Sequence, residues 1–265
     1  MSKTKIPYAE ESWSPTSGCS FGCQYCWSRA IAHRFGKSFA PTFHAERLAD
    51  PLHWRRPRRV LVCFNGDLFD PQITNAQIAA VWGVMAACPA HTFLVLTKRA
   101  ERMSAWFDWV AVEHSGGASV VVRNEASRRV RWSGYSQLSW PLPNVWLGVS
   151  VTNQSDADER IPHLLRCPAA VRWVSAEPLL GAINLGLMGT VAKDINPGYA
   201  PVYEMLHWVA AGQQSGPHAA PFDLAWARSL RDECQETSTA FAWKNPTGFP
   251  PLDGVVHNAM PKVDQ

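Results

Sequence analysis

Short apolar runs separated by helical or loop segments constrain the fold of this chain more than any other feature. Near-continuous apolar runs of this length suit parallel strands that are covered on both faces. Together with a first strand near residues 11–14, they predict an α/β fold with about six or seven βα units in a partial or complete parallel barrel. The six runs are residues 60–64, 92–96, 145–149, 171–174, 207–211 and 239–243.

The segments between the runs supply helices. Residues 76–87, with Asn75 as a candidate cap, and residues 222–236 carry apolar side chains at helical spacing, and residues 156–165 follow the turn-prone segment 152–155. With 265 residues and 46% hydrophobic content, the chain can bury a sizeable core. We therefore expect a single barrel domain over residues 1–265, with an insertion at about 113–143.

Two segments are rich in arginine: residues 55–59, and residues 123–131 within the insertion. Such segments can contact a phosphate backbone, but a charged approach to a buried strand and a solvated surface hairpin are the more common outcomes. The net charge of +3 is too small to indicate a nucleic-acid partner.

The chain shows no sign of membrane insertion or export. No run approaches the roughly 18 apolar residues of a membrane span, and residues 1–13 lack the apolar region of a signal peptide. We expect a cytoplasmic protein with no membrane partner.

Three cysteines, Cys19, Cys23 and Cys26, fall within eight residues at the spacing C-x3-C-x2-C, and Gly18 and Gly22 let this loop fold back. Seven cysteines without a secretory signal favour reduced thiols that can bind a metal over a disulfide framework. The other four are scattered, and we expect Cys63, Cys88 and Cys167 to be packing residues. The four are Cys63, Cys88, Cys167 and Cys234.

A structural zinc site is the alternative for these thiols. Zinc normally takes four protein ligands, often as two separated pairs, and no second C-x2-C or close histidine pair is present. His33 and His44 are the best candidates for a fourth ligand, but neither has a recognisable zinc-finger spacing.

The C-x3-C-x2-C spacing, with the aromatic Tyr25 directly before the last cysteine, resembles the radical S-adenosylmethionine (SAM) superfamily. The resemblance implies a partial (β/α)6 barrel and a [4Fe-4S] cluster on the three cysteines, with one iron open to SAM. It implies cleavage of SAM to a 5′-deoxyadenosyl radical, hydrogen abstraction from a substrate, and an external electron donor such as flavodoxin or ferredoxin.

The chain also resembles a narrower family, the phage-associated and bacterial radical-SAM-like proteins of unknown function. The segments that carry this likeness fall at the ends of expected strands, where a parallel barrel places its site. They are residues 11–19, 65–69, 96–99, 145–150, 175–181 and 252–254.

Four residues are candidates for binding SAM. Gly66 and Asp67 follow the second strand, where the resemblance implies contact with the SAM amino group; a helix-capping aspartate is the alternative. Ser150 and Asn153, after the fourth strand, offer donors and acceptors to a ribose or carboxylate.

Four charged residues at strand ends are candidates for catalysis. Lys98 and Arg99 can hold a carboxylate or phosphate. Glu177, expected beside Lys98 or Arg99, is either a substrate contact or one partner of an ion pair, and Lys244 needs an anionic partner.

Relatives usually carry Gly-Gly-Glu-Ser-Gly where this chain has residues 212–216, so Gln214 stands in place of a glutamate. The expected function is a radical SAM enzyme acting on an unidentified substrate, with a nucleotide or nucleic-acid base as the first class to test. The alternatives are a zinc-bound nucleic-acid-binding protein and a cluster-binding barrel without catalytic activity.

Overall fold

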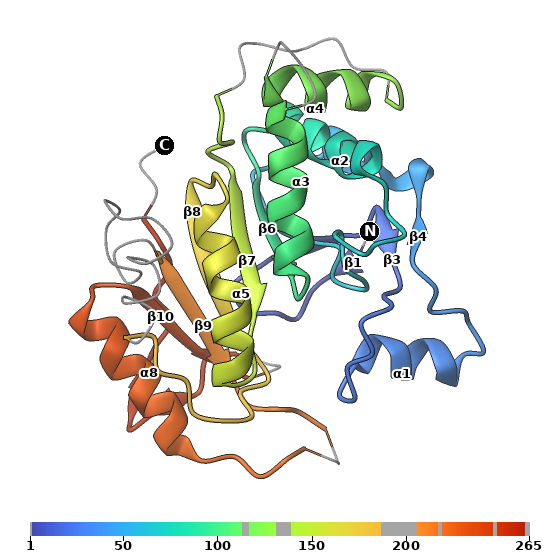
Figure 1. The fold of residues 1–265 in the computed structure, drawn as a ribbon. Coiled ribbons are helices and arrows are strands. Elements are labelled where there is room, and N and C mark those ends of the chain that lie inside the picture. The colour runs from blue at the N-terminus through green and yellow to red at the C-terminus, as the bar shows by residue number, and fades with distance from the viewer. Residues whose placement is uncertain are drawn as a thin grey trace. The chain divides into compact units, whose positions relative to one another are not determined.

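The computed structural model describes residues 2–112, 117–130, 139–186, 206–216, 219–245 and 248–262. The chain divides into two compact units. The first consists of Met1–Thr4, Tyr8–Trp146 and Pro168–Ala170, and the second of Lys5–Pro7, Leu147–Cys167 and Val171–Gln265. Figure 1 labels helices and strands of both units.

The sheet of the first unit has the strand order β1-β2-β5-β6. Strand β1 pairs antiparallel with β2, whereas β2, β5 and β6 are parallel, with Trp13 opposite Val62 and Val62 opposite Val95. The elements of this unit are β1 (Ser2–Lys3), β2 (Glu11–Trp13), β3 (Thr16–Ser17), α1 (Trp27–Arg34), β4 (Thr42–Phe43), η1 (Ala45–Arg47), η2 (Asp50–His53), β5 (Arg59–Val62), α2 (Asn75–Ala87), β6 (Thr92–Thr97), α3 (Ala100–Val112) and α4 (Ala118–Ser127).

Aromatic side chains fill the core between α2 and α3. The rings of Trp82 and Trp106 lie 4.6 Å apart, and Phe69, from the loop after β5, makes edge contacts with both. All three are at most 2% exposed. Burial of this aromatic area stabilises the unit and fixes the loop that leaves β5.

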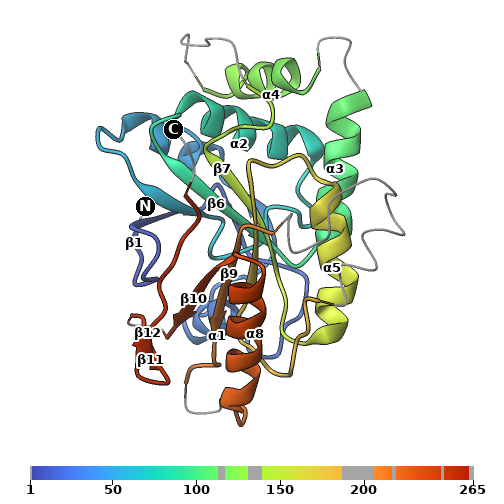
Figure 2. The same cartoon turned by 90° about the vertical axis from the view of Figure 1, so that its left-hand side faces the viewer.

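Helix α4 corrects the expectation of a solvated hairpin in the insertion. Val121, Val122 and Ala126 of α4 are buried, and a Cβ on Gly83 of α2 would collide with Val122 and Ala126. Figure 2 shows α4 lying along α2. Part of the insertion therefore extends the core, while residues 113–116 and 131–138 lie outside the described residues.

The second unit has the strand order β7-β8-β9-β10, and β8, β9 and β10 are parallel. Asn153 caps α5 and Asp223 caps α8 through side-chain oxygens. The elements are β7 (Val145–Ser150), whose first two residues belong to the first unit, α5 (Gln154–Arg166), β8 (Val171–Ala176), β9 (Trp208–Gly212), α8 (Leu224–Glu236), β10 (Ala240–Lys244), β11 (Pro251–Leu252) and β12 (Val255–Val256).

The predicted α/β class, with parallel strands alternating with helices, is confirmed. The cap expected at Asn75 is wrong by one residue, because Thr74 caps α2 in a reciprocal capping box with Gln77. None of the helices within the described residues has both the length and the apolar character needed to cross a membrane.

Candidate functional site

The cysteine loop, defined here as residues 18–27, lies directly against the turn that follows β5. Gly18 has φ +76°, and a Cβ there would collide with the carbonyl of Ala40. A Cβ on Gly66 would lie 2.5 Å from the Gly18 carbonyl oxygen, and the Gly18 N–H donates to the Asn65 carbonyl at 3.0 Å. Two glycines therefore allow a backbone approach that side chains would prevent.

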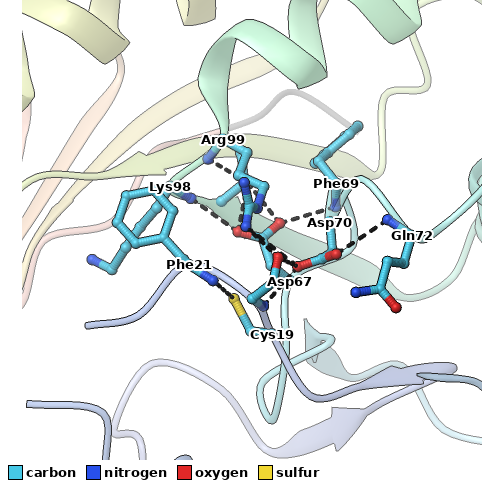
Figure 3. A network of polar contacts seen from close by, with 10 residues as sticks. Cys19, Phe21, Asp67, Phe69, Asp70, Gln72, Lys98 and Arg99 are labelled. Carbon is cyan, nitrogen blue, oxygen red and sulfur yellow. Dashed lines mark hydrogen bonds and ion pairs between the residues drawn. The ribbon is translucent and has the colours of Figure 1, made fainter. Parts of the chain in front are cut away.

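A buried carboxylate fixes the residue after the first cysteine (Figure 3). Ser20 donates its backbone N–H and its hydroxyl to Oδ2 of Asp70, each at 2.8 Å. Arg99 Nη2 lies 2.7 Å from the Ser20 hydroxyl oxygen and 3.4 Å from Asp70 Oδ2. Burial of Asp70 opposes its ionisation, but the hydrogen bonds from Ser20 and Gln72 and the charge of Arg99 lower its pKa.

Aromatic side chains of the loop contact the end of β6 and the end of β5. The Arg99 guanidinium lies 5.4 Å from the ring centroid of Phe21, and the Lys98 ammonium lies 5.4 Å from that of Tyr25. Trp27 packs on Phe64 with centroids 4.9 Å apart. Lys98 and Arg99, two of the candidates for catalysis, are thereby placed beside the cysteines.

Asp67 lies on the inner side of the same network. Its carboxylate accepts the Thr97 hydroxyl at 2.7 and 2.9 Å and the backbone N–H groups of Phe69 and Lys98. The side chain is buried, and this burial raises its pKa despite the hydrogen bonds. Asp67 caps no helix, since the cap of α2 is Thr74, seven residues later. The Asp67 carboxylate instead joins the loop after β5 to the end of β6.

The three loop cysteines are free and partly exposed. The Cys19 sulfur accepts the Phe21 N–H and the Cys26 sulfur accepts the Arg29 N–H, each at 3.4 Å; the second contact caps α1. Among the described residues, no three His, Cys, Asp or Glu side chains are grouped closely enough to hold a metal ion. Burial is the main reason why the pKa of Cys19 is raised to about 11, so its free form is a thiol at neutral pH.

The remaining cysteines are buried, as expected for packing residues. Burial raises the pKa of Cys63, Cys88 and Cys234 to about 12 in each case. Of the two histidines considered as a fourth ligand, His33 is exposed on α1. His44 Nε2 lies 2.7 Å from the Ser17 hydroxyl, and its Nδ1 lies 3.2 Å from Glu46.

Two candidate SAM-binding residues, Ser150 and Asn153, belong to the second unit and make hydrogen bonds within it. The Ser150 carbonyl accepts a hydrogen bond from the buried Arg160. Asn153 Oδ1 accepts the Asp156 N–H and so caps α5. The Ser150 hydroxyl is buried, and the Asn153 side chain is committed to the cap.

An ion pair joins the ends of β8 and β10 in the second unit. Lys244 Nζ lies 2.5 Å from Glu177 Oε1; the lysine side chain is fully buried and that of Glu177 is 27% exposed. A Cβ on Gly212, at the end of β9, would lie 2.8 Å from the Lys244 carbonyl and 3.4 Å from Glu177 Cγ. Glu177 therefore forms an ion pair, but its partner is Lys244 and not the expected Lys98 or Arg99, and part of its side chain stays accessible.

A model of the protein family described as "Protein of unknown function (DUF5131)" matches residues 3–261. The chain belongs to the DUF5131 family. It matches no curated protein and no solved structure. The match covers every candidate residue of both units in this DUF5131 chain, so the cysteine loop and the Glu177–Lys244 pair are parts of the family's domain rather than of an appended segment.

The donor set of the cysteine loop fits an iron–sulfur cluster in its chemistry. Three thiols lie on one loop and two of the sulfurs accept backbone N–H groups, which is a known way of tuning such clusters. Gly22 has φ +89°, a left-handed backbone conformation that glycine adopts more readily than other residues. Binding requires the sulfurs to converge and each thiol to lose its proton.

Sequence reasoning missed three residues of this DUF5131 site: Ser20, Asp70 and Thr97. Each lies close in sequence to a candidate residue. Ser20 lies in the cysteine loop, Asp70 in the loop after β5, and Thr97 at the end of β6. Parallel strands that end at one edge of a sheet bring such loops together. Polar residues next to the candidate residues could therefore have been predicted as part of the site.

Proposed function

We propose that this DUF5131 chain is a radical SAM enzyme with a partial β/α barrel, in which Cys19, Cys23 and Cys26 hold a [4Fe-4S] cluster. The observation that carries the proposal is the cysteine loop: three free thiols at C-x3-C-x2-C spacing, anchored to the ends of β5 and β6 by Asp70 and Arg99. When bound, the cluster supplies the electron that cleaves SAM to methionine and a 5′-deoxyadenosyl radical.

The residues beside the loop have roles that suit an amino acid ligand. The Arg99 side chain beside the loop is 18% exposed, so its guanidinium can donate to the SAM carboxylate. Asp67 holds the Lys98 backbone in place, and it can bind the SAM amino group only by adding a donor to those it already accepts. Gly66 brings the backbone close to the loop.

The second unit supplies the remaining candidates. Glu177 keeps part of its carboxylate accessible while the buried Lys244 fixes its orientation, which suits a contact with a substrate hydroxyl or amide. Ser150 and Asn153 are weaker candidates, because the hydroxyl of the first is buried and the amide of the second caps α5. The same proposal includes an external electron donor, such as flavodoxin or ferredoxin, and a cytoplasmic location.

The zinc-bound nucleic-acid-binding alternative has less support. His44 contacts Ser17 and Glu46 instead of completing a cysteine site. Arginines of both basic segments are engaged within the chain: Arg58 pairs with Glu11, and Arg128 pairs with Glu125.

Production of 5′-deoxyadenosine tests the proposal. After anaerobic reconstitution with iron and sulfide and reduction with dithionite, the protein is expected to convert SAM to 5′-deoxyadenosine, slowly without substrate. The Cys23→Ala variant is the control and is expected to form none. A fully reconstituted, reduced protein that leaves SAM intact would support the barrel without catalytic activity.

A further inference from the structure

Helix α1 exposes an apolar stripe directly after the cysteines. Of the eight large apolar side chains that are exposed among the described residues, four belong to residues 21–35: Phe21, Trp27, Ile31 and Phe35 at 37, 48, 49 and 67%. No residue of α1 is buried. Both views show α1 away from α2, α3 and α4, the other helices of the first unit (Figures 1 and 2).

The exposed residues form one face of the helix. At 100° per residue, Trp27, Ile31, Arg34 and Phe35 fall within about a third of the circumference. The Arg34 guanidinium lies 6.0 Å from the Phe35 ring centroid. One ring face of Trp27 contacts Phe64, which holds the indole in place. The stripe therefore combines fixed aromatic surfaces with a guanidinium.

The chain segment that carries this stripe has charges of a single sign. The sequence contains no aspartate or glutamate between Glu11 and Glu46, whereas it contains Arg29, Arg34 and Lys37. Among the described residues these three cations form no ion pair, and the guanidinium groups of Arg29 and Arg34 lie over aromatic rings. The basic segments noted from the sequence differ, because Arg59 and Arg129, for example, pair with Glu10 and Glu125.

We propose that α1 is a docking surface for single-stranded nucleic acid, with bases stacked on Trp27 and Phe35 and phosphates held by Arg34 and Lys37. Aromatic rings interleaved with unpaired cations are the combination that single strands use, because every base has a face that stacks and every nucleotide carries a negative charge. A protein partner of mixed charge would find no anion for its own cations within residues 12–45. At 1.5 Å per residue, the eight residues of α1 span about 12 Å, enough for only a few nucleotides.

The inference deepens the proposed function. It rests on that function only for the chemistry after binding, because a base stacked on Trp27 lies next to Cys26, the residue that caps α1. Binding itself requires no cluster. Failure of the two proposals can therefore be distinguished.

The test is fluorescence anisotropy of labelled 12-nucleotide oligo(dT) and oligo(U) with the full chain, before and after cluster reconstitution. We expect binding that weakens with salt. The Arg34→Gln/Lys37→Gln variant should reduce the slope of log K against log salt by about 1.4, since each phosphate contact on a single strand contributes about 0.7. Trp27→Ala should weaken binding about tenfold through lost stacking, and Trp27→Phe should restore most of it. The oligo(dT) and oligo(U) arms distinguish DNA from RNA.

The matched control is Arg55→Gln/Arg56→Gln, which removes the same charge from two exposed arginines at another place on the first unit. It should change binding much less than the α1 variant. Equal losses from the two double variants, no binding at 50 mM salt, or a dimer in light scattering that Trp27→Glu dissociates would each overturn the inference. The last result would make the stripe an interface between copies of the chain. Retained 5′-deoxyadenosine production in a protein that binds no oligonucleotide would overturn the inference and leave the proposed function intact.

Discussion

Ser20 donates both its backbone N–H and its hydroxyl to one carboxylate oxygen of Asp70, each across 2.8 Å. The pair joins the residue next to Cys19 to the loop after β5, at a carboxylate whose side chain is fully buried. Charge-assisted bonds of this kind are stronger than neutral ones, and leaving their partners unpaired is costly. Asp70 is thus the main polar anchor of the cysteine loop.

Asp70→Ala should therefore destabilise the first unit by about 1–3 kcal/mol, because it leaves the Ser20 N–H and hydroxyl without their acceptor and removes the carboxylate beside Arg99. Urea unfolding measures the loss. Asp108→Asn is the control, since Asp108 is exposed on α3 and should change stability little. A difference of under about 0.5 kcal/mol between the two variants would contradict the anchoring role.

Gly83→Ala tests the packing of α4 on α2. Alanine normally favours a helix by up to about 1 kcal/mol over glycine, but here the new methyl would collide with Val122 and Ala126. We expect a net destabilisation of about 1–3 kcal/mol in thermal or urea unfolding. Gly181→Ala is the control, because its methyl would meet only Asn153 Cβ at 3.5 Å. A stabilised Gly83→Ala protein would show that α4 does not cover α2.

The Lys244–Glu177 pair should behave as a buried ion pair. Glu177→Ala takes the carboxylate away from the fully buried ammonium and should cost about 3–5 kcal/mol. The double variant Glu177→Ala/Lys244→Met removes both charges and should recover much of that loss, as a double-mutant cycle in urea unfolding with the single variant Lys244→Met would show. Additive losses would mean that the two side chains are not coupled.

Asp253 provides a pH-dependent contact. Hydrogen bonds from Arg228, then from Arg231, lower its pKa from 3.8 to about 2. Because the folded-state pKa is depressed, the stabilisation is fully present above pH 3.8 and is lost as the pH falls through about 2. NMR titration of the Asp253 carboxyl should give this value, and Arg228→Gln/Arg231→Gln should return it toward 3.8. An unchanged pKa in that variant would contradict the assigned cause.

The sequence predicted the strands well because their side chains are buried on both faces. The run at 92–96, for example, became β6 (Thr92–Thr97). It predicted α2 and α8 from apolar spacing and α5 from the turn-prone segment before it, but it did not predict α3. It also did not predict α1, none of whose residues is buried and whose apolar stripe faces solvent. Residues 113–143 gave no helical signal strong enough to indicate α4, since glycines and arginines surround its three buried side chains.

For the candidate site, too, the sequence predicted some residues and not others. The cysteines and the residues at strand ends could be located from spacing and order along the chain. Their partners could not: Asp67 accepts a hydroxyl from Thr97, thirty residues later, and Arg99 reaches Ser20, seventy-nine residues earlier. Such pairs depend on which loops meet at one edge of a sheet, and a single sequence does not encode that in any local pattern.

The iron and acid-labile sulfide content of the reconstituted protein tests the central claim most directly. The account predicts about four of each per chain, lost in Cys19→Ala, Cys23→Ala and Cys26→Ala and kept in Cys234→Ala, whose thiol is buried in α8. Equal iron in Cys23→Ala and Cys234→Ala, or stoichiometric zinc in place of iron, would contradict it.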